Sequence, residues 1–540
     1  MSLSHHEHPI NETEQSITLQ TYTHAINKRH DFTPSIGRLR PVNVVEMFPN
    51  RKVSYNVQNV MQLMPLAGDC KQDMFMYTES VFVAWHAVWK RWPLFRYGKL
   101  SPLSTLQVPE SVPTFTIRQL LTTYTSLDRP ATSVCPWLLP NSLLDSLYGI
   151  CQLLYDTGTA VTPLTVTQLL ALPAGILDRP FNGLYLRAFY HHYLINHTNE
   201  WLNRARGNME NEEYPYRDFD TMEFAELSLI FSDRTEWGGT MTSNDDYPIM
   251  HERDYFTSAN PLPQKGTAVA TIAGQTIQDL TKAIHQQEIL EKDADAGNDH
   301  FQAILSRYGV APKSLGIMRP VTAAQPTRQT ISINPIFNNA GNTVAPSSGS
   351  LTGINLQGDI SGRGFSADGS HHVDYFSDVD GCLMTCIFIR PETIYHQGVN
   401  RMFTRLARTD FFEPAMITDG DEPIYNEELV FGLMAQAPFP VVTDKGRQVF
   451  GYRNKYMDFI HQPSRISGEL RTTMKSWSLH RDFFDNQNLN DSFVRVFDPP
   501  KRLFSYEGQS ARAAYPRFVC YMQFVGEMRD PIPNYTKREI

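Results

Sequence analysis

The stretch Arg40-Pro41-Val42-Asn43-Val44-Val45-Glu46-Met47-Phe48-Pro49-Asn50-Arg51-Lys52-Val53-Ser54-Tyr55-Asn56-Val57 places apolar side chains at alternate positions on both sides of a short turn. An alternation of period two is typical of β-strands that bury one face, and Pro49 with Asn50 favours a turn between them. Residues 38–65 are therefore predicted to form two strands, which indicates a fold built from β-sheet.

Other segments also have the composition of strands. Residues 74–85 end in an apolar run, and residues 383–389 are almost entirely apolar, as expected of a strand buried on both faces. Two closing strands are predicted at 493–504 and 517–525. With 41% apolar residues, 35 Pro and 31 Gly in 540 residues, the chain fits an all-β protein with a sizeable core and long loops.

Three segments interrupt the strand pattern. Residues 1–30 are polar and are predicted to form an N-terminal arm, while residues 94–253 and 312–369 are predicted to be insertions. The first insertion runs into an acidic tract, residues 208–254, whose thirteen acidic side chains and three arginines favour an exposed position away from DNA. The second is rich in Gly, Ser, Asn and Thr and is predicted to be a long loop. Helices are predicted at 143–154, 184–201 and 277–296.

The charge and the cysteines exclude several classes of protein. A net charge of −9 and a pI near 6.0 argue against a general nucleic-acid binder, so contact with a polyanion requires a local patch. No apolar run approaches the roughly eighteen residues of a membrane-spanning helix, and residues 1–15 lack the apolar core of a signal peptide. The six scattered cysteines indicate reduced thiols rather than a disulfide framework.

Cations and aromatic residues interleave near the end of the chain. The cations of this stretch are Arg447, Arg453, Lys455, Arg465, Arg471, Lys475 and Arg481. A second group, at helical spacing, is Arg401, Arg405 and Arg408. Cations can contact phosphates, and Tyr452, Tyr456 and Trp477 can stack on unpaired bases, so both groups are candidate nucleic-acid contacts. The alternative is a solvated face beside buried tyrosines.

The block Arg253-Asp254-Tyr255-Phe256-Thr257-Ser258-Ala259-Asn260-Pro261-Leu262-Pro263-Gln264-Lys265-Gly266 contains two prolines and a final glycine. Prolines stiffen the backbone and remove hydrogen-bond donors, which suits a rigid segment that braces loops. This pattern does not indicate a catalytic role. The candidate bracing or assembly residues are Asp254, Tyr255, Phe256, Pro261, Pro263, Gln264, Lys265 and Gly266.

Sequence patterns of catalysis and metal binding are not met. The glycines from Gly358 to Gly364 lack the spacing of a phosphate-binding loop, and Asp374 has Thr385 rather than Glu at the twelfth position of a calcium loop. The pair His371-His372 has no third ligand at metal spacing. We therefore assign no catalytic, cofactor-binding or metal-binding residue from the sequence, and expect no cofactor.

Several blocks together resemble the major capsid proteins of microviruses, which are small icosahedral phages with circular single-stranded DNA. The blocks are 181–190, 253–266, 288–297, 390–398, Phe450-Gly451-Tyr452, the run Pro463-Ser464-Arg465-Ile466-Ser467-Gly468-Glu469-Leu470-Arg471, and Trp477. Leu262 departs from the tryptophan that is common at its position. The resemblance covers roughly residues 32–505, with loops of divergent length.

The resemblance implies an all-β fold, an eight-stranded antiparallel jelly roll of the viral capsid type with long, partly helical insertion loops. It implies one capsid domain over residues 31–540 and a structural protein, not an enzyme. Sixty copies would assemble into a T=1 icosahedral shell around the DNA genome, in the virion and, during assembly, in the host cytoplasm. The expected partners are the chain itself and single-stranded DNA. Other virion proteins and a bacterial surface receptor are further candidate partners, and a membrane is not expected as one.

Three alternatives stay open at this stage. The arginines of the two cationic groups could pair with carboxylates of neighbouring subunits instead of DNA. The chain could also be a β-sandwich enzyme acting on polysaccharide, or a glycan-binding module. Particle size separates the last two from a capsid protein, because only a capsid protein forms shell-sized particles.

Overall fold

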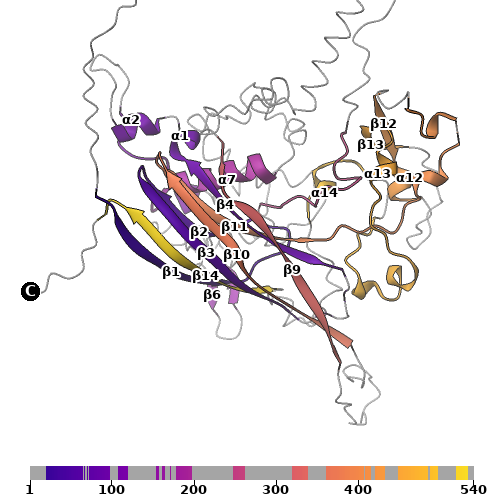
Figure 1. The fold of residues 1–540 in the computed structure, drawn as a ribbon, viewed down its shortest axis with the longest axis horizontal. Coiled ribbons are helices and arrows are strands. Elements are labelled where there is room, and N and C mark those ends of the chain that lie inside the picture. Colours follow the sequence, from indigo (N-terminus) through magenta and orange to yellow (C-terminus); the bar gives the residue numbers. More distant parts are fainter. Residues whose placement is uncertain are drawn as a thin grey trace, which may run out of the picture.

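The computed structural model describes residues 20–64, 66, 70, 72–89, 91–97, 108–119, 154–156, 161–163, 171, 175, 178–197, 247–261, 319–337, 360–406, 408–414, 420–431, 448–483, 487–496 and 518–532. Its largest element is an eight-stranded antiparallel sheet in the order β1-β14-β3-β10-β9-β4-β11-β2 (Figure 1). The strands are β1 (Tyr22–Phe32), β2 (Arg40–Met47), β3 (Arg51–Leu63), β4 (Met74–Ala84), β9 (Val321–Phe337), β10 (Ile360–Ser377), β11 (Gly381–Pro391) and β14 (Phe518–Asp530).

The sheet folds over into two layers that face each other. One layer has the order β1-β14-β3-β10 and the other the order β2-β11-β4-β9. Between them, Tyr55 of β3 lies 2.7 Å from Thr385 of β11, and the rings of Phe82 and Tyr375 stack with centroids 4.9 Å apart. Strand β9 joins the layers, because its first part pairs with β4 and its last part with β10. Two four-stranded layers with these neighbours form a jelly roll, which confirms the predicted fold.

The strands around the first quoted stretch form as predicted. β2 and β3 meet at a tight turn where Asn50 has a φ of 70°. β11 pairs with β2 on one side and β4 on the other, and its residues are almost all buried, which explains its uniformly apolar composition. The prediction of a helix at 184–201 is confirmed by α7 (Leu184–His197), which packs against β4 and β11.

Three of the sequence predictions are wrong in the described part of the chain. Much of 312–369 is not a loop, since it contains β9 and the first half of β10. Residues 22–30 of the predicted arm belong to β1, which pairs with β14 along its whole length. Residues 493 and 494 lie in helix α14 (Asp491–Val494) rather than in a strand. The sequence did not predict β1, β9 and the first half of β10 as strands, because many of their side chains are polar and exposed and the apolar alternation is therefore weak.

Several smaller elements lie outside the eight-stranded sheet. They are α1 (Trp85–Val88), α2 (Trp92–Tyr97), and the paired strands β5 (Thr114–Phe115) with β8 (Phe181–Asn182) and β6 (Leu154–Asp156) with β7 (Val161–Pro163). The predicted helix at 277–296 and all but the last residue of the one at 143–154 lie outside the described residues. Among the described residues, no helix is both long enough and apolar enough to cross a membrane.

A second lobe lies beside the jelly roll, at the right of Figure 1. It has its own hydrophobic cluster, which includes Phe256, Tyr395, Phe450 and Phe493. Its elements are β12 (Asp421–Tyr425), α12 (Asn426–Leu429), β13 (Val449–Asn454), α13 (Met457–Ile460), α14, and the 3-10 helices η4 (Arg401–Phe403), η5 (Arg408–Asp410), η7 (Gly468–Arg471) and η8 (Lys475–Trp477).

The segment 247–261, which we call the strap, connects the two hydrophobic clusters. Tyr247 and Ile249 belong to the jelly-roll core, whereas Tyr255 and Phe256 belong to the cluster of the second lobe. The strap thus fixes the position of the second lobe against the sheets, and the described candidate residues for assembly and genome contact lie on the strap or on this lobe.

Candidate assembly and genome-contact surface

The strap is held in the second lobe by the carboxylate of Asp254. Its Oδ1 accepts hydrogen bonds from the backbone N–H groups of Phe256 and Thr257, at 3.0 and 2.7 Å. Its Oδ2 accepts a hydrogen bond of 2.6 Å from the hydroxyl of Tyr395. One side chain therefore fixes the local turn and also ties the strap to a buried ring of the lobe.

The two aromatic residues that follow complete this attachment. The Tyr255 hydroxyl donates to Glu428, at 3.0 Å, and burial together with this carboxylate raises the pKa of Tyr255. The Phe256 ring packs against Tyr395 and Phe450 with centroids 4.9 and 6.1 Å apart. These contacts fit the predicted bracing role within one chain. A contact between subunits stays a prediction.

The strap ends at the edge of the described residues. Asn260 forms a backbone bridge with Tyr452 of β13, and Pro261 is half-buried beside it. The remaining candidates of this block, Pro263, Gln264, Lys265 and Gly266, lie outside the described residues.

The first group of candidate cations does not share a helical face. Arg401 belongs to η4 and Arg408 to η5, and no continuous helix joins them. Arg401 forms ion pairs with Glu422 and Glu428, and the carboxylates raise its pKa although burial opposes them. Arg405 is paired with Asp458. Arg401 and Arg405 are thus committed to ion pairs inside the lobe, while Arg408 is exposed.

Three cations of the second group donate to the protein's own backbone. Arg453 donates to the carbonyl of Tyr255 and to the hydroxyl of Ser258, both at 2.9 Å. Arg465 donates to the Gly398 carbonyl, and Arg481 donates to the Phe493 carbonyl, at 2.7 Å. Burial lowers the pKa of all three guanidinium groups. Their immediate role is structural, because they satisfy carbonyl groups that the lobe encloses.

The other cations of this group are more accessible. Arg471 is exposed, and the Lys475 ammonium lies 3.6 Å from Asp482 with 39% of its side chain exposed. Lys455 lies over the ring of Tyr456, 5.5 Å from its centroid. Arg447 lies outside the described residues.

The three candidate stacking rings differ in accessibility. Tyr456 is 5% exposed and its hydroxyl contacts the backbone near Phe411, so this ring has no open face for a base. Tyr452 and Trp477 are half-buried. Contact with DNA by any residue of the two groups stays a prediction.

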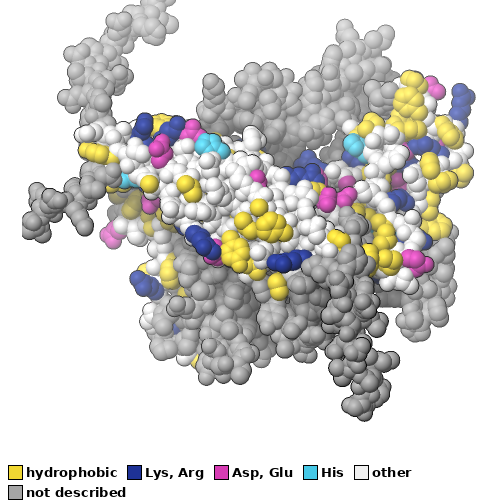
Figure 2. Space-filling model, turned by 60° about the horizontal axis from the view of Figure 1, so that its bottom comes forward, with side chains coloured by type: hydrophobic (Ala, Val, Ile, Leu, Met, Phe, Trp, Pro, Cys, Tyr) yellow, Lys and Arg dark blue, Asp and Glu magenta, His cyan; other side chains and the backbone are white. Residues whose placement is uncertain are grey.

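An exposed apolar surface covers part of the second lobe, and hydrophobic side chains gather there at the right of Figure 2. Phe412 contacts the ring of Phe459, which in turn lies 3.8 Å from the Arg405 guanidinium. We call this surface the apolar patch. It consists of Met402 (55% exposed), Phe403 (71%), Leu406 (82%), Phe411 (56%), Phe412 (53%), Phe459 (46%) and Ile460 (72%).

Residues 270–538 match the model of a family described as "Capsid protein (F protein)". The matched segment contains the last four strands of the jelly roll and most of the second lobe. The chain belongs to this capsid protein family.

Two curated relatives of the family agree with this result. Capsid protein VP1 of Chlamydia phage 1 is 25% identical over 276 residues, which cover 50% of this chain and 43% of that protein. Capsid protein VP1 of Bdellovibrio phage phiMH2K is 23% identical over 496 residues, covering 76% of this chain and 86% of that protein. Both phages are microviruses, as the resemblance predicted. Membership of a capsid family indicates a structural protein of the virion.

Sequence reasoning missed the apolar patch and two groups of histidines with carboxylates. The patch comes from short 3-10 and α-helices and from the turns beside them, where no periodicity separates exposed from buried apolar residues. The side-chain groups are Glu79 with His192 and His197, and His396 with His480 and Asp482. In each group one member, Glu79 or His396, lies far from the other two in the chain, so local spacing shows only a pair and not the third side chain.

Proposed function

We propose that this protein is the major capsid protein of a microvirus, and that sixty copies form a T=1 icosahedral shell around a circular single-stranded DNA genome. The jelly-roll strand order and the family match support a capsid role. The observation that carries self-assembly is the apolar patch. Monomeric soluble proteins rarely leave so many large apolar side chains exposed together, so a second copy of the chain is the occupant we infer.

The genome contact is inferred from charge. A chain with a net charge of −9 can hold a polyanion only through locally concentrated cations. Arg408 and Arg471 are the best candidates in the described part of the chain, because both are exposed. The competing role for them is pairing with carboxylates of neighbouring subunits. Salt separates the two roles, since each phosphate contact contributes roughly 0.7 to the salt dependence of binding to a single strand.

Expression of the full chain followed by size-exclusion chromatography and negative-stain microscopy tests the assembly. We expect closed, shell-sized particles of uniform diameter, and nuclease digestion should show that packaged nucleic acid is single-stranded DNA. A soluble monomer would overturn the proposal and would favour the polysaccharide-active enzyme or the glycan-binding module.

The double variant Phe403→Ser with Leu406→Ser tests the role of the apolar patch. We expect fewer particles and more free subunits, with unchanged β content by circular dichroism, because both side chains are exposed in the subunit. Ile532→Ser is the matched control, since it removes an exposed apolar side chain (49%) at the end of the jelly roll. Normal particle yield from the double variant would remove the patch from the assembly interface.

A further inference from the structure

Glu79 is a buried carboxylate at the boundary between β4 and α7. Ser80 points into the space between the two sheets, where it contacts His371, so Glu79 points to the opposite, outer face of β4. There its Oε1 lies 2.9 Å from Nε2 of His192 and 2.7 Å from Nε2 of His197. Three atoms that can act as metal ligands therefore converge within 4.8 Å of one another.

The charge of this group is only partly balanced. Within the described part of the chain, the ion pairs of the Glu79 carboxylate are those with His192 and His197, both of them buried rings. Arg390 adds only a longer-range attraction. A buried anion held mainly by two imidazoles is a favourable place for a cation that can bind all three.

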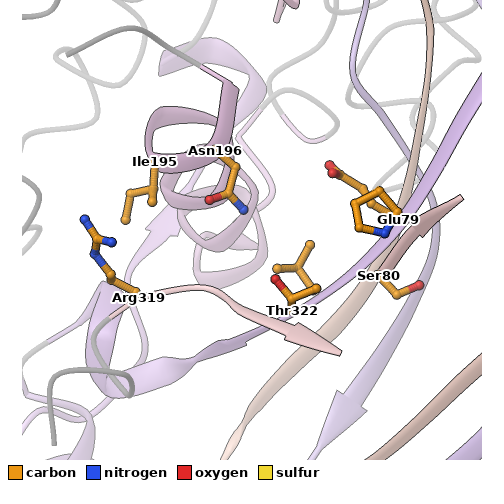
Figure 3. Close-up of a pocket in the computed structure, with 8 residues that line it drawn as sticks. Glu79, Ser80, Ile195, Asn196, Arg319 and Thr322 are labelled. Carbon is orange, nitrogen blue, oxygen red and sulfur yellow. The ribbon is translucent and has the colours of Figure 1, made fainter. Parts of the chain in front are cut away.

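A cavity opens next to these side chains. It has a volume of about 430 Å³ and is lined by residues that include Glu79, Asn196 and Thr322. In Figure 3, Glu79 of β4 and Asn196 of α7 lie on neighbouring walls, and Arg319 lies across the cavity from Glu79. The cavity provides both an entry path and room for a water molecule next to the carboxylate.

We propose that Glu79 Oε1, His192 Nε2 and His197 Nε2 bind one divalent transition-metal ion, with Zn²⁺ as the preferred ion and water from the cavity as the fourth ligand. Two imidazole nitrogens and a carboxylate oxygen are a common ligand set for zinc, and the tetrahedral site is then completed by water. The ion links α7, which belongs to an insertion, to β4 of the jelly roll.

The surrounding groups must adjust for this role. The side-chain amide nitrogen of Asn196 lies 3.0 Å from Nδ1 of His192. Metal binding at Nε2 requires this amide to turn over, so that its oxygen accepts the Nδ1 proton. Tetrahedral ligands at zinc distances are about 3.3 Å apart, so the three side chains must separate by roughly half an ångström. The adjoining cavity gives Glu79 the space for that movement.

The second group of this kind is a useful internal comparison. His396 Nε2 and His480 Nε2 lie 2.7 and 3.3 Å from Asp482 Oδ1. However, the Lys475 ammonium already lies 3.6 Å from the other oxygen of Asp482. A cation beside this carboxylate opposes the binding of a second one, so we assign the metal to Glu79 and not to Asp482.

Titration of the chelator-treated full chain with Co²⁺ tests the proposal directly. Co²⁺ substitutes for Zn²⁺ and gives visible absorption bands that report four-coordinate geometry. We expect one equivalent of Co²⁺ per chain, displacement of Co²⁺ by Zn²⁺, and a higher melting temperature with either ion. Wild-type protein that binds neither ion would overturn the proposal, and Glu79 would then belong to a hydrogen-bonded network alone.

Variants locate the site. Glu79→Gln and His192→Gln should abolish the Co²⁺ bands and the metal-dependent increase in melting temperature. The controls His396→Gln and His372→Gln, at the competing group and on the exposed side of β10, should retain both. Loss of the bands in His396→Gln, with retention in Glu79→Gln, would place the metal at Asp482 and refute our assignment. If a Glu79 or His192 variant fails to fold by circular dichroism, the wild-type titration and His396→Gln still decide.

Discussion

Protonation of His371 is expected to make the jelly roll acid-sensitive. His371 of β10 is fully buried between the sheets, with its Nε2 2.9 Å from the Ser80 hydroxyl and its Nδ1 3.3 Å from the Thr327 hydroxyl. Burial lowers the pKa of His371 from 6.5 to about 4. In the unfolded chain the same ring is expected to titrate near its ordinary value.

The sign and size of the effect follow from this difference. Between about pH 4 and pH 6.5 the unfolded chain binds a proton at residue 371 that the folded chain does not bind. The contribution of His371 to the free energy of unfolding is therefore fully present above pH 6.5 and is lost as the pH falls toward 4. Each pKa unit corresponds to about 1.4 kcal/mol, so His371 accounts for a loss of about 3 kcal/mol in the free energy of unfolding across this window.

Urea unfolding of the unassembled subunit, followed by circular dichroism at several pH values, measures this loss. His371→Gln keeps a polar group near Ser80 but cannot be protonated, so its unfolding free energy should fall less steeply with decreasing pH than that of the wild type. His372→Gln is the control, because His372 is exposed on the opposite face of the same strand and should leave the slope unchanged. Other buried groups titrate equally in all three proteins, so their contributions cancel. Equal slopes for His371→Gln and the wild type would refute the reasoning.

Three further predictions concern the second lobe, the genome contact and the acidic tract. Gly398→Ala should destabilise the lobe by about 2 kcal/mol or more, as measured by urea unfolding, because the added methyl group would overlap the Glu428 carbonyl, whereas Gly369→Ala has only ordinary contacts and should be nearly neutral. The double variant Arg408→Ala with Arg471→Ala should retain particle assembly, but the slope of log binding constant against log salt concentration for DNA should flatten by roughly 1.4. Failed assembly with unchanged DNA binding by free subunits would instead place both arginines at an interface between subunits. Limited proteolysis of intact particles should cut the acidic tract before the strands, and complete protection of the tract would contradict its exposed placement.

The sequence by itself determined those strands and helices whose buried side stays the same along their whole length. β3 buries one face along its whole length, so its apolar residues alternate, and the helix α7 carries the longer apolar period. β11 has a neighbour on both sides and is covered on both faces, so its apolar run identified it as an inner strand. The family blocks determined the jelly roll and the capsid role, which composition alone would have left among several β-rich classes.

Tertiary structure decided which of the predicted site residues are accessible. Arg401, Arg405 and Arg453 have the same local sequence character as Arg471, yet they are engaged by carboxylates or carbonyl groups of distant segments. Tyr456 was available for stacking by composition, but it is buried in the lobe. Whether such a cation or ring is accessible depends on contacts with segments that lie elsewhere in the chain. The local sequence pattern does not predict those contacts.

The same limit explains β9, β10 and the group around Glu79. β9 and β10 have many polar, exposed side chains, so backbone pairing with β4 and β3 rather than side-chain pattern makes them strands. Glu79 is separated by 113 and 118 residues from the two histidines that meet it. Only the packing of α7 on the outer face of β4 brings these three ligands together, because convergence in space depends on the fold and not on spacing in the sequence.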